Sequence, residues 1–198
     1  MAYGLRPIQF TSGGYNSGGF TEYPIVDGET DDMFTGCLML QEAVGYVTAL
    51  ALTPTGATSV LSTVGVAVGF RYVDPNGTPV WSQYYAGNAN NTKAFAFIAD
   101  DPTQRFLIKS DGATVQADMG LNADVVSSTG TATEIEQGST TTGNSSIVLD
   151  FSSQAVTATL GLRLISIPKD GVNETSSTPN VEVKINPDCH QLIRSTGL

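Results

Sequence analysis

Charged side chains are scarce in this chain, and cationic ones are the scarcest. Asp, Glu, Lys and Arg make up 14% of the 198 residues, against roughly a quarter in an ordinary soluble protein. Nine Lys and Arg stand against 19 Asp and Glu, which gives a formal net charge of −10. Nucleic-acid binding needs clustered cations that neutralise phosphates, and an anionic membrane repels an acidic surface. The composition therefore predicts a protein that binds neither nucleic acid nor membranes.

Groups that carry metal or nucleophilic chemistry are also few. The chain has two cysteines, Cys37 and Cys189, and one histidine, His190. They lack the CxxC or HxxxH spacing of a zinc site, which takes roughly three or four ligands. Cys189 and His190 are adjacent, so on an extended chain they point to opposite faces and do not pair for catalysis. We expect no metal, no cofactor and no catalytic residue. The small number of cysteines also favours a reducing compartment. Whether Cys37 and Cys189 pair is left open.

Long apolar runs are missing as well. No segment approaches the roughly 18 apolar residues that a membrane-spanning helix needs. Residues 1–7 lack the basic region and apolar core of a signal peptide. The sequence therefore predicts neither a signal peptide nor a membrane-spanning segment.

The acidic residues do not form a recognisable active site. Asp31-Asp32 and Asp100-Asp101 are neighbours in sequence, whereas glycosidases place two carboxylates across a cleft from each other. The acidic segment 27–32 lacks the ligand spacing of an EF-hand, and an irregular calcium loop stays a minor alternative. A small β-hydrolase is therefore the weakest hypothesis.

What is present is a series of short strands. Residues 64–73 are rich in Val, and Asp74-Pro75-Asn76-Gly77 follows as a turn. Residues 79–85 return as a second strand, which predicts a β-hairpin. Residues 181–185 alternate apolar and polar side chains, as a half-buried strand does. With no long helical period, residues 31–198 predict one all-β body, an antiparallel β-sandwich or small β-barrel. Its C-terminal tail, residues 188–198, contains Leu192, Ile193 and Leu198 and is expected to dock.

Residues 1–30 differ from this body. They show no strand of useful length, yet large apolar side chains recur among their glycines. A disordered tail is poor in such apolar side chains, because it has nothing to bury. This pattern is typical of an extended N-terminal arm that docks on its own body, on a sister subunit or on another protein. The expected anchors are Tyr3, Leu5, Ile8, Phe10, Tyr15, Phe20 and Tyr23.

Aromatic residues gather once more in the second strand of the hairpin. Four-residue spacing would place Trp81 and Tyr85 on one strand face, with Ser82 and Tyr84 opposite. Such rings could stack on sugars, but a contact within the hairpin or between subunits is the favoured interpretation.

The chain resembles, over nearly its whole length, a family of small virion proteins from tailed bacteriophages, including those that infect cyanobacteria. The order of several short motifs carries this resemblance, while residues 113–138 and 169–180 match nothing. The motifs are Tyr3-Gly4-Leu5-Arg6-Pro7, residues 64–72 with Asp74-Pro75, residues 79–85, Ala99-Asp100-Asp101-Pro102 with Phe106, Asp111-Gly112, residues 140–145 with Leu149-Asp150, Leu162-Arg163-Leu164, and His190-Gln191-Leu192 with Gly197-Leu198.

The resemblance implies a capsid decoration, or cement, protein on the outer surface of the phage head. Such proteins bind the major capsid protein and clamp adjacent capsomers against the pressure of packaged DNA. They are homo-oligomers, for which a trimer is favoured over a dimer here. The alternative is a carbohydrate- or receptor-binding β-module of a phage tail fibre or spike.

Overall fold

The computed structural model describes residues 2–11, 14, 19–52, 62–128 and 138–195. In this part of the chain every helical segment is a short 3-10 turn, and all strand pairing within the sheets is antiparallel. The turns are η1 (Gln116–Asp118), η2 (Phe151–Ser153), η3 (Asn173–Thr175) and η4 (Pro187–Cys189). The all-β prediction is confirmed. Of the two architectures expected, the sheets are consistent with a sandwich, and none in the described residues closes into a barrel.

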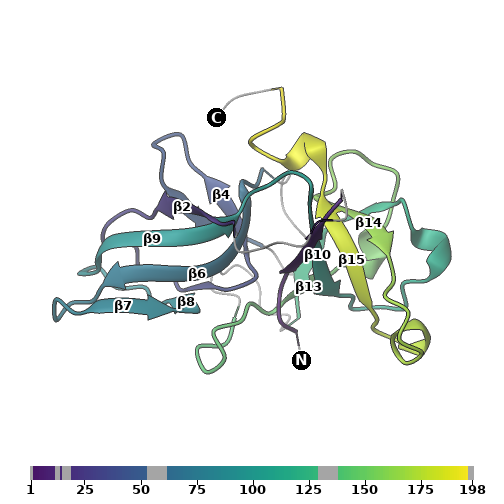
Figure 1. Cartoon of the computed structure of the whole chain (residues 1–198), viewed down its shortest axis with the longest axis horizontal. Coiled ribbons are helices and arrows are strands. Elements are labelled where there is room, and N and C mark those ends of the chain that lie inside the picture. Colours follow the sequence, from purple (N-terminus) through teal and green to yellow (C-terminus); the bar gives the residue numbers. More distant parts are fainter. Residues whose placement is uncertain (1, 12–13, 15–18, 53–61, 129–137, 196–198) are drawn as a thin grey trace.

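Two larger sheets form the body and lie side by side as two lobes (Figure 1). The first has the order β1 (Arg6–Phe10), β10 (Gln104–Lys109), β15 (Asn180–Ile185), β14 (Leu162–Ser166) and β11 (Asn122–Ala123). The second has the order β2 (Thr21–Pro24), β9 (Thr92–Ala99), β6 (Gly65–Val73), β4 (Leu38–Gln41) and β5 (Val47–Ala49), with β7 (Pro79–Ser82) also paired to β6.

Two strand pairs complete the fold. Strand β12 (Val125–Ser127) pairs with β13 (Ile147–Leu149), and β3 (Met33–Phe34) pairs with β8 (Tyr84–Tyr85).

Strand β6 is the centre of the second sheet, and its glycines explain how it fits there. The pairing of β6 with β9 slips between Ala67 and Gly69, which is a β-bulge of the kind that these glycines predict. A side chain at Gly65 would begin 2.4 Å from the carbonyl oxygen of Ala99, so only glycine permits this approach. The predicted hairpin is confirmed over β6 and β7, where Gly77 takes φ +80° in the turn.

The apolar interior is continuous between the lobes. One buried cluster contains Phe106, Leu164 and Val183 of the first sheet together with Val66 and Leu38 of the second. A second cluster lies against β6 and β9 and includes Phe70, Ile98 and Tyr85. Because one cluster draws from both sheets, the lobes bury apolar surface jointly.

The N-terminal thirty residues correct one expectation. They do contain strands, β1 and β2, and each is the edge strand of a different sheet. Pro7 and Pro24 lie in these strands, as befits edge positions where a missing N–H costs no ladder bond. The segment is extended, as expected, but its described parts pair with the body of their own chain.

Candidate functional surfaces

A crossing of two glycines fixes the start of the N-terminal segment. Gly4 has φ +70° and Gly36 has φ +90°, both in the left-handed region that glycine tolerates. A Cβ on Gly4 would lie 2.6 Å from the Gly36 carbonyl oxygen, and one on Gly36 would lie 2.8 Å from that of Tyr3. The Leu5 N–H donates to the Gly36 carbonyl at 2.9 Å. The Leu5 side chain is thereby held in the core, with 0% exposure.

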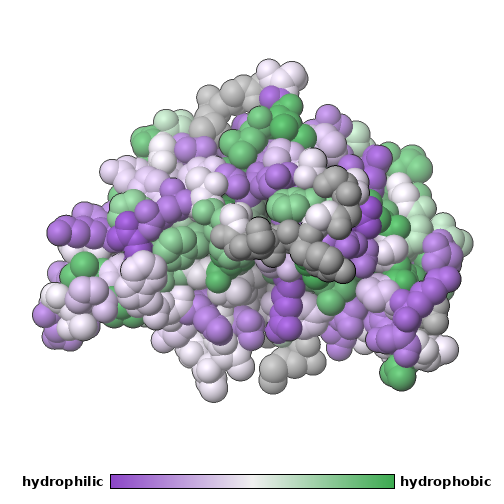
Figure 2. Space-filling model, viewed as in Figure 1, coloured by the Kyte–Doolittle hydropathy of each residue, from purple (hydrophilic) through white to green (hydrophobic). Residues whose placement is uncertain are grey.

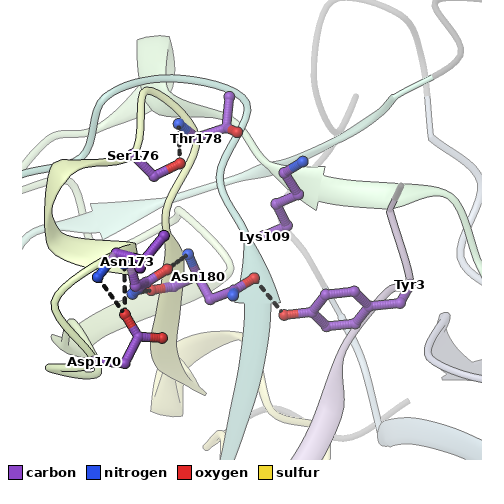
Figure 3. Close-up of a pocket in the computed structure, with 8 residues that line it drawn as sticks. Tyr3, Lys109, Asp170, Asn173, Ser176, Thr178 and Asn180 are labelled. Carbon is purple, nitrogen blue, oxygen red and sulfur yellow. Dashed lines mark hydrogen bonds between the residues drawn. The ribbon is translucent and has the colours of Figure 1, made fainter.

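Tyr3 joins a polar network rather than an open binding site (Figure 3). Its hydroxyl donates to Asn180 Oδ1 at 2.7 Å, and the Asn180 N–H donates to Asn173 Oδ1 at 2.6 Å. Asn173 Nδ2 donates to the carbonyl oxygens of Pro168 and Asn180. Burial raises the pKa of Tyr3, and nearby Arg6 opposes that rise. The polar groups of Tyr3, Asn173 and Asn180 thus satisfy one another's hydrogen bonds. They line a pocket of about 340 Å³, and we interpret them as an attachment point of the N-terminal segment.

The other expected anchors occupy mixed positions. The Tyr23 hydroxyl donates to Asp100 Oδ2 at 2.8 Å, which together with burial raises the pKa of Tyr23. Ile8 and Phe10 are half-buried on β1, while Phe20 is exposed. Tyr15 lies outside the described residues. Leu5 and Tyr23 therefore dock on their own chain, and Phe20 is the described anchor most open to a partner.

The expected aromatic platform is only partly formed. Trp81 is 71% exposed on β7, whereas Tyr85 is fully buried on the separate strand β8, so the expectation that these two rings share one strand face is wrong. The physical reason is a bend at Gln83, where the Tyr84 N–H donates to Ser82 Oγ and the strand leaves β6. After the bend, β8 pairs with β3 instead.

Beyond this bend, Tyr84 and Tyr85 pack against different residues. Tyr85 packs edge-on against Tyr72 with ring centroids 5.0 Å apart, and its hydroxyl donates to the Glu29 carbonyl. Tyr84 is half-buried and stacks on Phe34 at 5.9 Å. Tyr85 is thus a core residue and not a subunit contact.

Trp81 belongs instead to the outer face of the second sheet. Its indole stacks on Phe97 at 5.7 Å, across a position left open by Gly69. Beside it Arg71 lies over the Phe95 ring at 3.9 Å and forms an ion pair with Glu22. That ion pair lowers the pKa of Glu22 and raises that of Arg71. The pairing register between strands brings Trp81, Phe97, Arg71 and Phe95 together on this face. Spacing along the sequence does not reveal that register.

A shallow pocket of about 290 Å³ adjoins Trp81. One wall is the bent strand, with Trp81, Gln83 and Tyr84, and the other is the turn 140–143. The Thr35 N–H donates to the carbonyls of both Gln83 and Gly143, each at 3.0 Å, and so joins the two walls. Sequence reasoning missed the threonines of this turn because nothing local connects them to Trp81.

A second group of exposed side chains is apolar; the sequence predicted docking for its two members in the C-terminal tail, Leu192 and Ile193, but not for Val44 and Tyr46. Val44 and Tyr46 lie in the turn between β4 and β5, and Leu192 and Ile193 lie in the C-terminal turn. The Gln191 side chain joins these turns, since it accepts from the Gln41 N–H and donates to the Gln41 carbonyl, both at 2.8 Å. Both turns stand at the upper edge of the molecule in Figure 1, where Figure 2 shows hydrophobic side chains. We call these four residues the apolar edge.

The two cysteines and the histidine are buried inside the protein. Cys37 and Cys189 are buried free thiols, and burial raises their pKa to about 12 and about 11. His190 is fully buried, and its Nδ1 accepts from the Leu192 N–H at 3.3 Å. Burial lowers the pKa of His190, against an opposing effect of Asp100 and Asp101. Within the described ranges, His, Cys, Asp and Glu nowhere gather in a group of three or more that could hold a metal ion.

The helices of the described part are all too short or too polar to cross a membrane. Comparisons with protein-family models, with curated proteins and with solved structures return no match.

Proposed function

We propose that this protein is a capsid decoration protein on the outer surface of a tailed-phage head, where it binds the major capsid protein and stabilises adjacent capsomers. It would act as a homo-oligomer, with a trimer favoured over a dimer, and without catalysis. The ordered motifs in the sequence suggest the family, and the apolar edge is the structural observation that supports the proposal.

The apolar edge has the properties of a protein contact. Val44 is 72% exposed, and Leu192 and Ile193 are each about half exposed. Exposed apolar side chains that are grouped, rather than scattered, are a feature of interaction sites. The Gln191–Gln41 hydrogen bonds hold the two turns together before any partner arrives. A preformed contact loses less conformational entropy on binding.

The N-terminal segment supports the proposal in a different way from the one its sequence suggests. Because β1 and β2 each form one edge strand of a larger sheet, the segment braces the protein itself. A rigid body of this kind can transmit load between two capsomers that it touches. Many copies on one head would then multiply modest individual contacts. The net charge of −10 favours exposure to solvent over contact with packaged DNA.

The test is binding to expanded heads of the encoding phage that lack this protein. The double variant Val44→Asp/Leu192→Asp places charges on the apolar edge, and Val156→Asp is the matched control because Val156 is 87% exposed elsewhere. In co-sedimentation, we expect occupancy by the double variant to fall at least roughly tenfold and that of Val156→Asp to match the wild type.

Thermal unfolding of each variant establishes that it is folded. Failure of the wild-type protein to bind heads would overturn the proposed function. Equal occupancy by all three folded proteins would show that the apolar edge is not the contact.

A further inference from the structure

The pocket between Trp81 and the turn 140–143 has an unusual combination of linings. Among the residues that the structure describes, its walls carry two aromatic rings, one side-chain amide and several hydroxyl groups, and no carboxylate or cation. The lining residues are Trp81, Ser82, Gln83, Tyr84, Thr140, Thr141, Thr142 and Gly143. These described lining residues are neutral, although the chain as a whole carries a net charge of −10.

Both aromatic rings are braced from behind. Trp81 stacks on Phe97 with 14° between the ring planes, and Tyr84 stacks on Phe34 with 15°. A ring whose one face is covered by a second ring keeps a fixed orientation and offers its remaining surface to a ligand. Trp81 stays 71% exposed although it has such a partner, so most of its apolar surface meets water.

The opposite wall is equally well held. In the turn, the Gly143 N–H donates to the Ser139 carbonyl at 2.7 Å, and the Ser139 N–H donates to the Asn144 carbonyl at 3.0 Å. Gly143 packs so closely on Gln83 that a Cβ there would lie 2.7 Å from the Gln83 Cβ. The exposed hydroxyls of Thr140 and Thr141 are therefore carried by a fixed turn at the lower edge of the molecule (Figure 1).

We propose that this pocket binds a neutral oligosaccharide, a function separate from capsid decoration. A sugar ring has a face of C–H groups that lies well against an electron-rich aromatic face. Its hydroxyls need both donors and acceptors at the rim, which amide and hydroxyl side chains provide. Because the described lining residues carry no charge, we expect neutral sugars to bind in preference to uronic acids or sialic acids. Because the pocket is shallow, we expect Kd values on the order of 1 mM for a short oligosaccharide.

The experiment uses the full-length ¹⁵N-labelled protein and a panel of probes. Cellohexaose, laminarihexaose, maltohexaose and mannohexaose are the neutral probes, and hexagalacturonate is the charged one. We expect at least one neutral probe to shift the amide resonances of residues 81–84 and 140–143. Trp81→Ala should weaken that binding at least roughly tenfold, and Thr140→Ala/Thr141→Ala should weaken it without touching the sheet. Tyr46→Ala, which removes an exposed ring from another edge, should leave it unchanged.

Variant stability is measured by thermal unfolding, and Trp81→Thr, which removes the ring but keeps a side chain suited to a strand, replaces Trp81→Ala if the latter fails to fold. The proposal is overturned if no neutral probe shifts these resonances. It is overturned equally if hexagalacturonate binds as tightly as any neutral probe, or if binding survives both the Trp81 and the threonine variants.

Discussion

Leu5→Ala tests whether the N-terminal segment is part of the folded core. Leu5 is fully buried beside residues of both sheets, and a free arm would leave it in solvent. The substitution removes three carbon atoms, or about 2.4 kcal/mol of transfer free energy at about 0.8 kcal/mol each. The cavity left behind raises the loss of unfolding free energy to about 3–4 kcal/mol.

Thermal and urea-induced unfolding measure this loss. In a protein of this length each kcal/mol shifts Tm by roughly 2–4 °C, so we expect Tm to fall by roughly 6–16 °C. Leu192→Ala is the matched control, because it makes the same chemical change at a side chain 49% exposed, and it should cost less than about 1 kcal/mol.

A refuting result would be a Leu5→Ala protein whose unfolding free energy lies within about 0.5 kcal/mol of the wild type. The segment would then contribute nothing to the core. The expected result has a practical consequence for the proposed function, because deleting residues 2–24 would remove an edge strand from each sheet. Loss of head binding by such a deletion would report unfolding as readily as a lost contact.

Three further predictions concern backbone, pH and thiols. Gly36→Ala should cost at least about 2 kcal/mol more in urea unfolding than Gly45→Ala, since both have positive φ but only Gly36 meets another chain segment. The pKa of His190 in the folded protein lies below its ordinary 6.5, so the stability that this shift contributes is complete above pH 6.5 and is lost as pH falls through the folded pKa. In urea unfolding, the free energy of unfolding should therefore fall more between pH 7.5 and pH 5.0 for the wild type than for His190→Gln. Cys37 and Cys189 should react with a thiol reagent in denaturant and not in the native protein at pH 7.5, as followed by absorbance.

Local sequence signals predicted those parts of the fold that depend on local pairing. The β6–β7 hairpin follows from a turn whose residues impose its geometry, and the bulge follows from glycine in a strand. Strands β1 and β2 gave no such signal. Their partners, β10 and β9, lie far along the chain, and each segment is short and contains proline. Such edge strands are specified by tertiary pairing more than by their own propensity.

The aromatic site shows the limit of spacing rules. Counting residues along the chain placed Trp81 with Tyr85, because the rule assumes an uninterrupted strand. One bend at Gln83, fixed by Thr35 from a distant segment, separates them and brings Trp81 next to the turn 140–143. Neither Thr35 nor that turn is close to Trp81 in sequence, so a single sequence could not reveal the pocket.

The two proposed activities are compatible because of where their sites lie. The apolar edge stands on the turns at the top of the molecule in Figure 1, and the pocket beside Trp81 lies on β7, β8 and the turn at the bottom. A protein bound to a capsid through its apolar edge would leave the opposite edge facing outward. The neutral pocket would then be displayed on the surface of the head, in many copies. Since weak single contacts gain strength from repetition, millimolar sugar binding by one copy would suffice for attachment to a glycan-bearing surface.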